Sequence, residues 1–470
     1  MISGRARSAV MAVVALLLAA SCLGRTAEPP KKPVTSRLRS APNVLIFLTD
    51  DQRVEALSAM PKTLRWFRDK GVEYPYAFAT TPLCCPFRAS LFSGRYAHNH
   101  RVRLNKQSTN LDQDETLQGY LQKAGYFSGI TGKFLNNWSI NEVPRHFDRW
   151  AFFTPSPTER GYYDVEFNID GDVRVVESYM TSFIEDMAID MMASFEEDDD
   201  RPWLLYVTPY APHTPYTTLP KYAAAPVAAW DRNPAVREVS VFDKPRFVRQ
   251  AGVAASEISS LRVAQLRSLM PVDDLVDRVL RKVRRLGEQR RTLAFFMSDG
   301  GYLWGEHGVI GKKLPYTPSA RIPFYARWPG RLPQGRRDNS LVMNIDVAPT
   351  VLQAAGVDPG AARDMDGRSL LGPGTRDRDR VLLEHWRDQG ALSWPTWASL
   401  WTRRYQYVEY YGRDNQKVSY EEFYDLKKDP WQMHNLLHDL DPENDPDPAW
   451  LARVRTRLER DRLCSAEDCP

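Results

Sequence analysis

The sequence predicts an α/β protein built on a parallel sheet, followed by a smaller antiparallel subdomain. Continuous apolar runs are typical of strands buried on both faces of a parallel sheet, and they occur at 43–49, 203–208 and 292–297. Helical patterns alternate with these runs, as in repeated strand–helix units. After a turn-rich linker at 371–374 the pattern changes to short strands around turns, such as 405–411. This change predicts the antiparallel subdomain with a packed helix.

Helices are expected between the strands. Apolar spacing predicts one helix ending near Gly71 and another capped by Gly125, with the next strand running to Thr131. A long amphipathic helix covers 257–286, and Pro271 should kink or split it because proline has no amide hydrogen. A further helix is expected at 347–355. Two stretches show no clear pattern and are expected to be long loops at the rim of a pocket, residues 155–200 and 215–255.

Composition excludes several classes of protein. A chain of 470 residues with 43% hydrophobic residues is large enough for about two or three domains and is not disordered. The 63 basic and 59 acidic residues nearly balance, so no electrostatic signature of nucleic-acid binding is present. Five cysteines are too few for a disulfide scaffold.

The N-terminus has the pattern of an export signal. Arg5 and Arg7 precede an apolar run at 9–20 that is too short to span a bilayer. Small residues before Cys22 resemble a bacterial lipoprotein box, which leaves lipidation and ordinary cleavage both open. We therefore expect a signal or lipoprotein segment at 1–27 and a tether at 28–41. The protein is expected to be exported from a bacterium, as a secreted or a lipid-anchored cell-surface protein.

Polar side chains follow the predicted strands at their carboxyl ends, where open parallel sheets bind ligands. Asp50 and Asp51 follow the first strand, and Asp299 follows the strand at 292–297. Lys133 and His213 follow two other strands. Each residue alone also fits a cap, a turn or the surface. Together, three aspartates would repel one another without a cation, and oxygen ligands favour Ca²⁺ or Mg²⁺.

The segment from Cys84 to Gly94 reads CCPFRASLFSG. It resembles the type I sulfatase signature, C-x-P-x-R followed by an apolar position and glycine. The resemblance implies that Cys84 is oxidised to formylglycine (3-oxoalanine) by a formylglycine-generating enzyme. It also implies that Arg88 holds the modified residue through charge-assisted hydrogen bonds. A chance Cys-Cys loop is the structural alternative.

The resemblance extends from about residue 42 to residue 437. It assigns metal binding to Asp50 and Asp51, and active-site roles to Lys133 in Gly-Lys and to His213 in Ala-Pro-His. Gly311-Lys312 followed by Arg321-Ile322-Pro323 makes Lys312, rather than Lys313, the second active-site lysine. The implied fold is alkaline-phosphatase-like, with a central mixed sheet. We expect a catalytic domain at 42–371 and a C-terminal subdomain at 380–470.

Two positions depart from the family pattern. The metal set implied by the resemblance is Asp50, Asp51, Asp299, the modified Cys84 and position 300, but Gly300 stands where the family has Asn or His. Water or a backbone group would have to replace that ligand, or the ion would be bound less tightly. Leu135 stands where His is frequent. These variants resemble the N-acetylglucosamine-6-sulfatase branch.

The expected activity is hydrolysis of a sulfate ester on a sugar or an aryl group. Lys133, Lys312 and His213 would contact the sulfate, and His213 or Lys312 would protonate the leaving oxygen. Two alternatives stay open: a phosphate or phosphonate ester hydrolase of the same superfamily, and a silent exported binding protein in which Cys84 remains a thiol. Cys464 and Cys469 are expected to pair in an oxidising compartment, and Cys85 fills the variable motif position.

Overall fold

The computed structural model describes residues 38, 40–155, 161–198, 200–357, 360, 363–372, 377–388 and 393–470. The chain divides into a unit of residues 1–35 and a unit of residues 36–470, and the fold described below belongs to the second unit. The predicted signal segment with Cys22 and nearly all of the tether lie outside the described residues. Among the described helices, none combines the length and apolar character needed to cross a membrane.

The main sheet is mixed and mostly parallel, as predicted. Its described strands have the order β13-β2-β12-β9-β1-β8-β4-β5-β6-β7. The central five are parallel: β9 (Thr292–Ser298), β1 (Asn43–Thr49), β8 (Trp203–Thr208), β4 (Phe127–Lys133) and β5 (Arg149–Phe153). Antiparallel pairings add β12 (Phe324–Arg327), β2 (Val72–Glu73), β6 (Val165–Ile169) and β7 (Asp172–Val176) at the flanks. The edge strand β13 (Arg336–Arg337) pairs with β2 in parallel.

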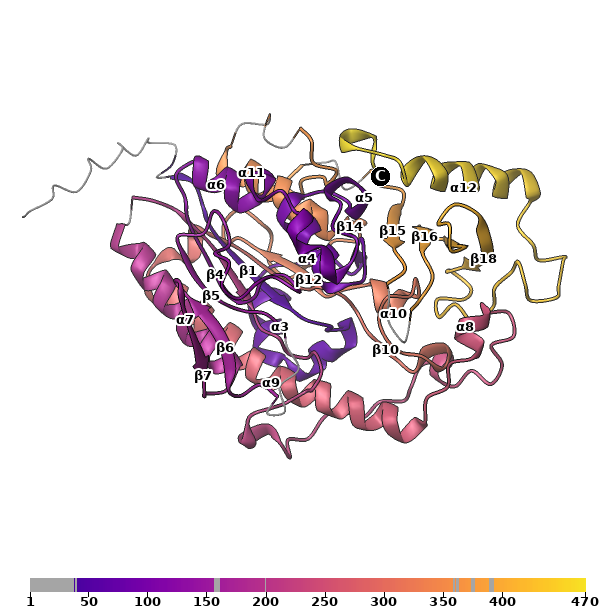
Figure 1. Ribbon diagram of the computed structural model, residues 1–470, viewed down its shortest axis with the longest axis horizontal. Helices are drawn as coiled ribbons and strands as arrows, with labels where there is room; N and C mark the ends of the chain where they lie inside the picture. Colours follow the sequence, from indigo (N-terminus) through magenta and orange to yellow (C-terminus); the bar gives the residue numbers. More distant parts are fainter. Residues whose placement is uncertain are drawn as a thin grey trace, which may run out of the picture. The chain divides into compact units, whose positions relative to one another are not determined.

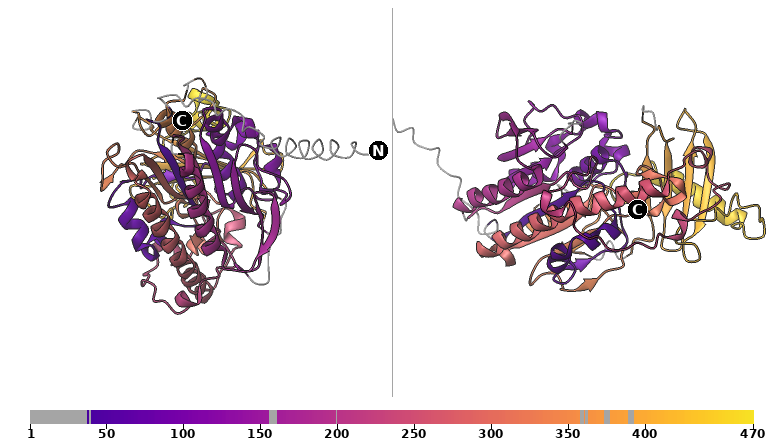
Figure 2. Two further views of the ribbon diagram at one scale, coloured as in Figure 1. Left: turned by 90° about the vertical axis from the view of Figure 1, so that its left-hand side faces the viewer. Right: turned by 90° about the horizontal axis from the view of Figure 1, so that it is seen from below.

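Helices cover both faces of this sheet (Figures 1 and 2). Side chains of β1 alternate: Val44 and Ile46 join one buried cluster, and Leu45 and Phe47 join the other. The first cluster includes α4 (Cys84–Ser93), α6 (Leu117–Lys123) and α11 (Val347–Ala355). The second includes α3 (Pro61–Phe67), α7 (Met180–Phe195) and α9 (Ala255–Arg285). Two apolar layers therefore enclose the buried strands, as continuous apolar runs predict.

The C-terminal subdomain is a four-stranded antiparallel sheet with a helix packed on it (Figure 1). Its strands are β15 (Val381–His385), β16 (Trp397–Trp401), β17 (Tyr405–Tyr411) and β18 (Val418–Asp425), and its helix is α12 (Pro448–Asp461). Leu451, Val454 and Leu458 of α12 join the buried cluster of this sheet. The predicted antiparallel sheet and packed helix are confirmed. Linker residues 373 and 374 lie outside the described residues.

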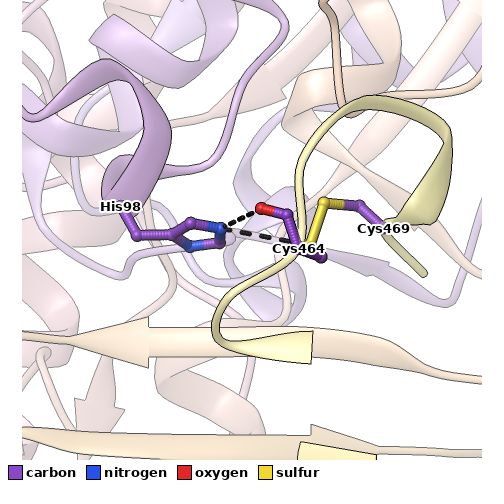
Figure 3. Close-up of side chains that lie close together, drawn as sticks. All are labelled: His98, Cys464 and Cys469. Atoms are coloured by element: carbon purple, nitrogen blue, oxygen red, sulfur yellow. Dashed lines mark hydrogen bonds between the residues drawn. A yellow bond between two sulfur atoms is a disulfide. The ribbon is translucent and has the colours of Figure 1, made fainter. Parts of the chain in front are cut away.

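The predicted Cys464–Cys469 disulfide is present, and it closes a short loop after α12 (Figure 3). His98, from α5 (Ala97–His100), lies within 2.9 Å of the Cys464 carbonyl oxygen through Nε2. Its Nδ1 pairs with Glu384 of β15 at 2.8 Å. One histidine therefore joins the helical layer, the small sheet and the C-terminal disulfide loop.

Shorter elements connect these layers. The small pairs are β3 (Ala77–Phe78) with β14 (Val342–Met343) and β10 (Leu303–Trp304) with β11 (Ile310–Gly311). Two short helices are α8 (Arg246–Arg249) and α10 (Thr317–Ala320). Residues 215–255 hold only α8 and short 3₁₀ turns, in agreement with the irregular pattern of the sequence.

The expectation of a long loop at 155–200 was wrong, and the predicted split of the long helix at Pro271 does not occur. Residues 155–200 contain β6, β7 and α7 rather than a long loop. Asp170 and Gly171 both have positive φ, 51° and 101°, as expected for a tight hairpin turn at an Asp-Gly pair. Pro271 does not split α9, which is one helix. The carbonyl of Arg267, which lacks an amide donor at the proline, accepts a 2.8 Å hydrogen bond from Thr218 Oγ1 instead.

Candidate active site

The carboxyl ends of β1, β9 and β4 meet at one edge of the sheet. Thr49 pairs with Ser298 in the parallel register, so Asp50 and Asp299 leave adjacent strands side by side. The Asp299 amide donates a 3.0 Å hydrogen bond to the Thr49 carbonyl oxygen. Strand β4 runs beyond the predicted end at Thr131 and brings in Lys133 as its last residue.

Only glycine fits between these strands at position 132. Gly132 has φ of 110°, and a Cβ there would lie 2.2 Å from the Thr208 carbonyl oxygen. This close approach holds β4 against β8 at the point where Lys133 enters the site. Close packing of the backbone therefore requires glycine at position 132, independently of any catalytic role.

Three carboxylates and a thiol converge at this edge. One ligand atom from each of Asp50, Asp51, Asp299 and Cys84 lies within 4.8 Å of the others, and all four residues are buried. Asp51 adopts a φ of 65°, a conformation that aspartate tolerates better than most residues, and its amide lies 3.3 Å from Asp299 Oδ1. Clustered oxygen donors of this kind suit a hard cation such as Ca²⁺ or Mg²⁺.

Cys84 is the first residue of α4, and its side chain faces the carboxylates. Sγ lies 3.5 Å from Asp50 Oδ1 and 2.9 Å from Lys312 Nζ. Cys84 forms no disulfide. Burial, helped by the neighbouring Asp50, raises the pKa of the Cys84 thiol to about 11. The thiol therefore stays protonated at neutral pH, where it is a poor nucleophile.

Arg88 lies one helical turn after Cys84 and bridges the strands. It is fully buried, and Nε donates a 2.8 Å hydrogen bond to Asp299 Oδ2. One terminal nitrogen donates a 2.6 Å bond to the Lys133 carbonyl oxygen, and the other lies 3.6 Å from Asp50 Oδ2. The guanidinium therefore positions two carboxylates and the end of β4.

Two lysines add positive charge. Lys133 Nζ pairs with Asp50, and Lys312 Nζ pairs with Asp51. Lys312 Nζ also lies 3.8 Å from Asp50 Oδ1 and 3.7 Å from Asp299 Oδ1. Burial would raise the pKa of Asp50, but Lys133 and the other cations hold that pKa well below its usual range. Burial would lower the pKa of Lys312, yet Asp51 and its neighbours keep that pKa well above the usual value.

His213 lies at the open side of the cluster, in the loop after β8. Nε2 lies 3.9 Å from Asp51 Oδ2, and the side chain is 22% exposed, more than its site neighbours. Nδ1 lies 2.9 Å from the Thr214 carbonyl oxygen, so the proton of the neutral ring belongs on Nδ1. The ring stacks on Tyr210, whose ring also lies 5.4 Å from Lys133 Nζ. Tyr210 was not among the predicted site residues, although it directly precedes the Ala-Pro-His motif.

Gly300 brings no side chain to this cluster. Its carbonyl oxygen accepts a 2.9 Å hydrogen bond from Ser298 Oγ. A Cβ at position 300 would lie 3.4 Å from Cδ of Lys312. The other predicted site residues come together from six segments, and the small residue at 300 leaves room for the Lys312 side chain.

Comparison with known proteins agrees with these observations. The profile of the family described as Sulfatase matches residues 42–357, and that described as N-sulphoglucosamine sulphohydrolase, C-terminal, matches residues 305–447. A structure described as BT4656 in complex with its substrate D-glucosamine-2-N,6-O-disulfate superposes with a TM-score of 0.72 at 23% identity. That superposition covers 89% of this chain and 96% of the other. The alkaline-phosphatase-like fold expected from the sequence is therefore confirmed.

Relatives in sequence extend this likeness. The chain is 33% identical over 367 residues to the extracellular sulfatase SULF-1 homolog of Drosophila melanogaster, a match that covers 74% of this chain but 32% of that protein. It is 28% identical over 485 residues to N-acetylglucosamine-6-sulfatase of Homo sapiens, with 91% of this chain and 86% of that protein covered. Because the family profile spans more than half of the sequence, the chain is a member of the sulfatase family.

Proposed function

We propose that this protein hydrolyses the sulfate ester of a sulfated sugar. The observation that carries the proposal is the placement of Cys84, buried at the start of α4 among three carboxylates and within 2.9 Å of the Lys312 ammonium. Cys84 forms no disulfide, so its side chain is free for modification. The names of the relatives support a sugar as the group that carries the sulfate.

We propose that Cys84 acts after conversion to formylglycine. A thiol with a pKa near 11 supplies little thiolate at neutral pH. The hydrated aldehyde supplies two hydroxyl groups, one to attack sulfur and one to expel sulfate. Position 84 is fixed by the backbone of α4, and this helix is anchored one turn later by the hydrogen bond from Arg88 to Asp299.

Asp50, Asp51 and Asp299 would hold a divalent cation, with Ca²⁺ as the first choice and Mg²⁺ as the second. When bound, such an ion polarises sulfate oxygens and stabilises the developing negative charge. Without it, the three aspartates balance the charges of Arg88, Lys133 and Lys312. A divalent cation would therefore give the cluster the net positive charge that attracts an anionic ester.

Lys133, Lys312 and His213 would contact the sulfate. Both lysines remain charged, because neighbouring carboxylates raise the pKa of each above its usual value despite burial. We assign the leaving-group proton to His213 rather than to Lys312. His213 lies at the more exposed side of the cluster, where a leaving group would depart. The neighbouring carboxylates raise the pKa of Lys312 well above its usual value, so its ammonium holds the proton tightly.

Export is part of the proposal. The basic and apolar N-terminus has the pattern of a secretory signal, and two relatives are named extracellular sulfatases. Cys22 would carry the lipid if the segment is processed as a lipoprotein. A formylglycine-generating enzyme would then act on the chain during maturation.

Activity assays with two cysteine variants test the proposal. The wild type should release sulfate from a panel of sulfated sugars, and Cys84→Ala should bind these sugars without turnover. Cys85→Ala is the matched control because Cys85 is also buried but lies toward the Asn136 carbonyl oxygen, at 4.0 Å. It should retain turnover. Hydrolysis by Cys84→Ala, or a preference for phosphonate or phosphate esters in parallel assays, would contradict the proposal.

A further inference from the structure

The segment 384–388, at the end of β15, carries buried polar atoms that have no hydrogen-bond partner within the described part of the chain. His385, the last residue of β15, is fully buried, and neither ring nitrogen has a hydrogen-bond partner among the described residues. Arg387 Nε and Asp388 Oδ1 are also buried and unpartnered. Native proteins leave few such atoms, because each one gives up hydrogen bonds to water without replacement. Four such atoms on three residues within the stretch 385–388 indicate a ligand.

This segment adjoins the catalytic residues on one side. The Glu384 amide donates a 2.9 Å hydrogen bond to the Thr80 carbonyl oxygen, four residues before Cys84. Lys313, next to the active-site lysine, donates a 2.5 Å bond to Asp388 Oδ2 through Nζ. The segment is therefore attached both to the chain that leads into α4 and to the loop that supplies Lys312.

A second loop near α4 meets the same segment. The Arg103 guanidinium lies 5.0 Å from the centre of the Trp386 ring. Asn105 Oδ1, two residues later, accepts a 3.0 Å bond from the Cys85 amide. Arg103 Nε and Asn136 Oδ1 are themselves buried and unpartnered. Unsatisfied polar groups from three segments thus gather around the start of α4.

The chemistry of these groups matches hydroxyls rather than a second anion. Asp388 offers an acceptor, Arg103 and Arg387 offer donors, and Asn136 offers an acceptor. Burial, with a smaller contribution from Lys313, lowers the pKa of His385 to about 3. The ring is therefore neutral and presents one donor and one acceptor. A sulfate would need donors alone, whereas sugar hydroxyls both donate and accept.

We propose that His385 and Asp388, with Arg103, Arg387 and Asn136 beside them, form the subsite for the hydroxyl groups of the sugar that carries the sulfate ester. The subsite rests on the proposed sulfatase function and determines which sugar that function accepts. A site built to pair with hydroxyls rejects analogues that lack them, because its own polar groups are then left unpaired.

Two histidine variants test the subsite. His385→Phe keeps an aromatic ring on Trp397, whose ring centre lies 6.0 Å away, and removes both nitrogens. His438→Phe is the matched control, because His438 is exposed and stacks on Tyr420 at 4.4 Å. The measured quantity is kcat/KM for N-acetylglucosamine 6-sulfate divided by kcat/KM for nitrophenyl sulfate, which carries no sugar hydroxyls. This ratio should fall about 10-fold or more in His385→Phe and stay at the wild-type value in His438→Phe.

Asp388→Asn provides a second test at a partly exposed position, where folding is less at risk. It removes the carboxylate acceptor with little change in size, and the same ratio should fall about 10-fold. Asp388→Asn also weakens the ion pair with Lys313, but this loss affects hydrolysis of both sulfate esters equally. The ratio of the two kcat/KM values therefore reports only the contacts to the sugar hydroxyls. An unchanged ratio in folded His385→Phe and Asp388→Asn, with an active wild type, overturns the subsite alone. A wild type that hydrolyses neither sulfate overturns the proposed function and the subsite together.

Discussion

Lys312 Nζ lies 2.9 Å from Cys84 Sγ, although 228 positions separate the two residues in the chain. The adjacent Lys313 points away and pairs with Asp388 of the C-terminal subdomain. Removing the Lys312 charge should therefore reduce kcat/KM for a sulfate ester about 100-fold or more, as loss of a transition-state donor does. Steady-state assays of Lys312→Met and Lys313→Met make the comparison. A larger loss in Lys313→Met would show that the wrong lysine has been assigned.

Arg88 should matter for stability as much as for activity. Its removal in Arg88→Leu leaves Asp299 without its 2.8 Å partner in a fully buried position. Breaking a buried ion pair from one side destabilises a protein by about 3–5 kcal/mol. Urea unfolding would measure the loss, with Arg65→Leu on the exposed face of α3 as the control. A change of less than about 1 kcal/mol in Arg88→Leu would contradict the bridging role.

Removal of divalent cations should abolish hydrolysis. Among the described residues, Asp50, Asp51 and Asp299 form the group of three clustered carboxylates that could hold the ion. A chelator should remove activity, and added Ca²⁺ should restore it, with Mg²⁺ restoring less. Asp51→Asn should need a higher Ca²⁺ concentration for half-maximal activity, because it removes a charged ligand. Full activity after exhaustive chelation would exclude the metal site.

The pairing of His98 with Glu384 predicts a pH-dependent stability. Burial alone would lower the pKa of His98, but Glu384 raises it from 6.5 to about 9. Because the folded pKa is the higher one, the pair stabilises fully below pH 6.5 and loses its effect as pH rises through 9. Wild type should exceed His98→Gln by about 2 kcal/mol at pH 6, and the difference should shrink toward pH 9.

Denaturant titrations across this pH range would measure the difference between the two proteins. Glu384→Gln should produce the same trend, since it removes the other member of the pair. A difference that stays constant between pH 6 and pH 9 would mean that the histidine is not charged in the folded state.

The site residues that can be predicted from sequence are those whose positions follow from strand order, helix periodicity or a short motif. Asp50, Asp51 and Asp299 follow apolar strands, and parallel register brings strand ends together whatever the loops do. Cys84 and Arg88 lie one helical turn apart, so they share a face of α4. These residues needed only strand and helix periodicity and a short motif to be found.

The rest depends on contacts between distant segments. Nothing near Tyr210 in sequence shows that it stacks on His213 and lies over Lys133. The unpartnered nitrogens of His385 become visible only once β15 is packed against the rest of the fold. Pro271 was misjudged for the same reason, because the hydroxyl that satisfies the free carbonyl comes from Thr218, in another segment.

The central claim is that Cys84 does not remain a cysteine. Mass spectrometry of the peptide that contains Cys84, from protein purified from its native host, tests this claim most directly. Cys85 in the same peptide serves as an internal reference, since alkylation should label only that thiol. We expect a peptide about 18 Da lighter than the sequence requires, the mass change for an aldehyde in place of the thiol. A peptide of unmodified mass from protein that hydrolyses sulfate esters would contradict it.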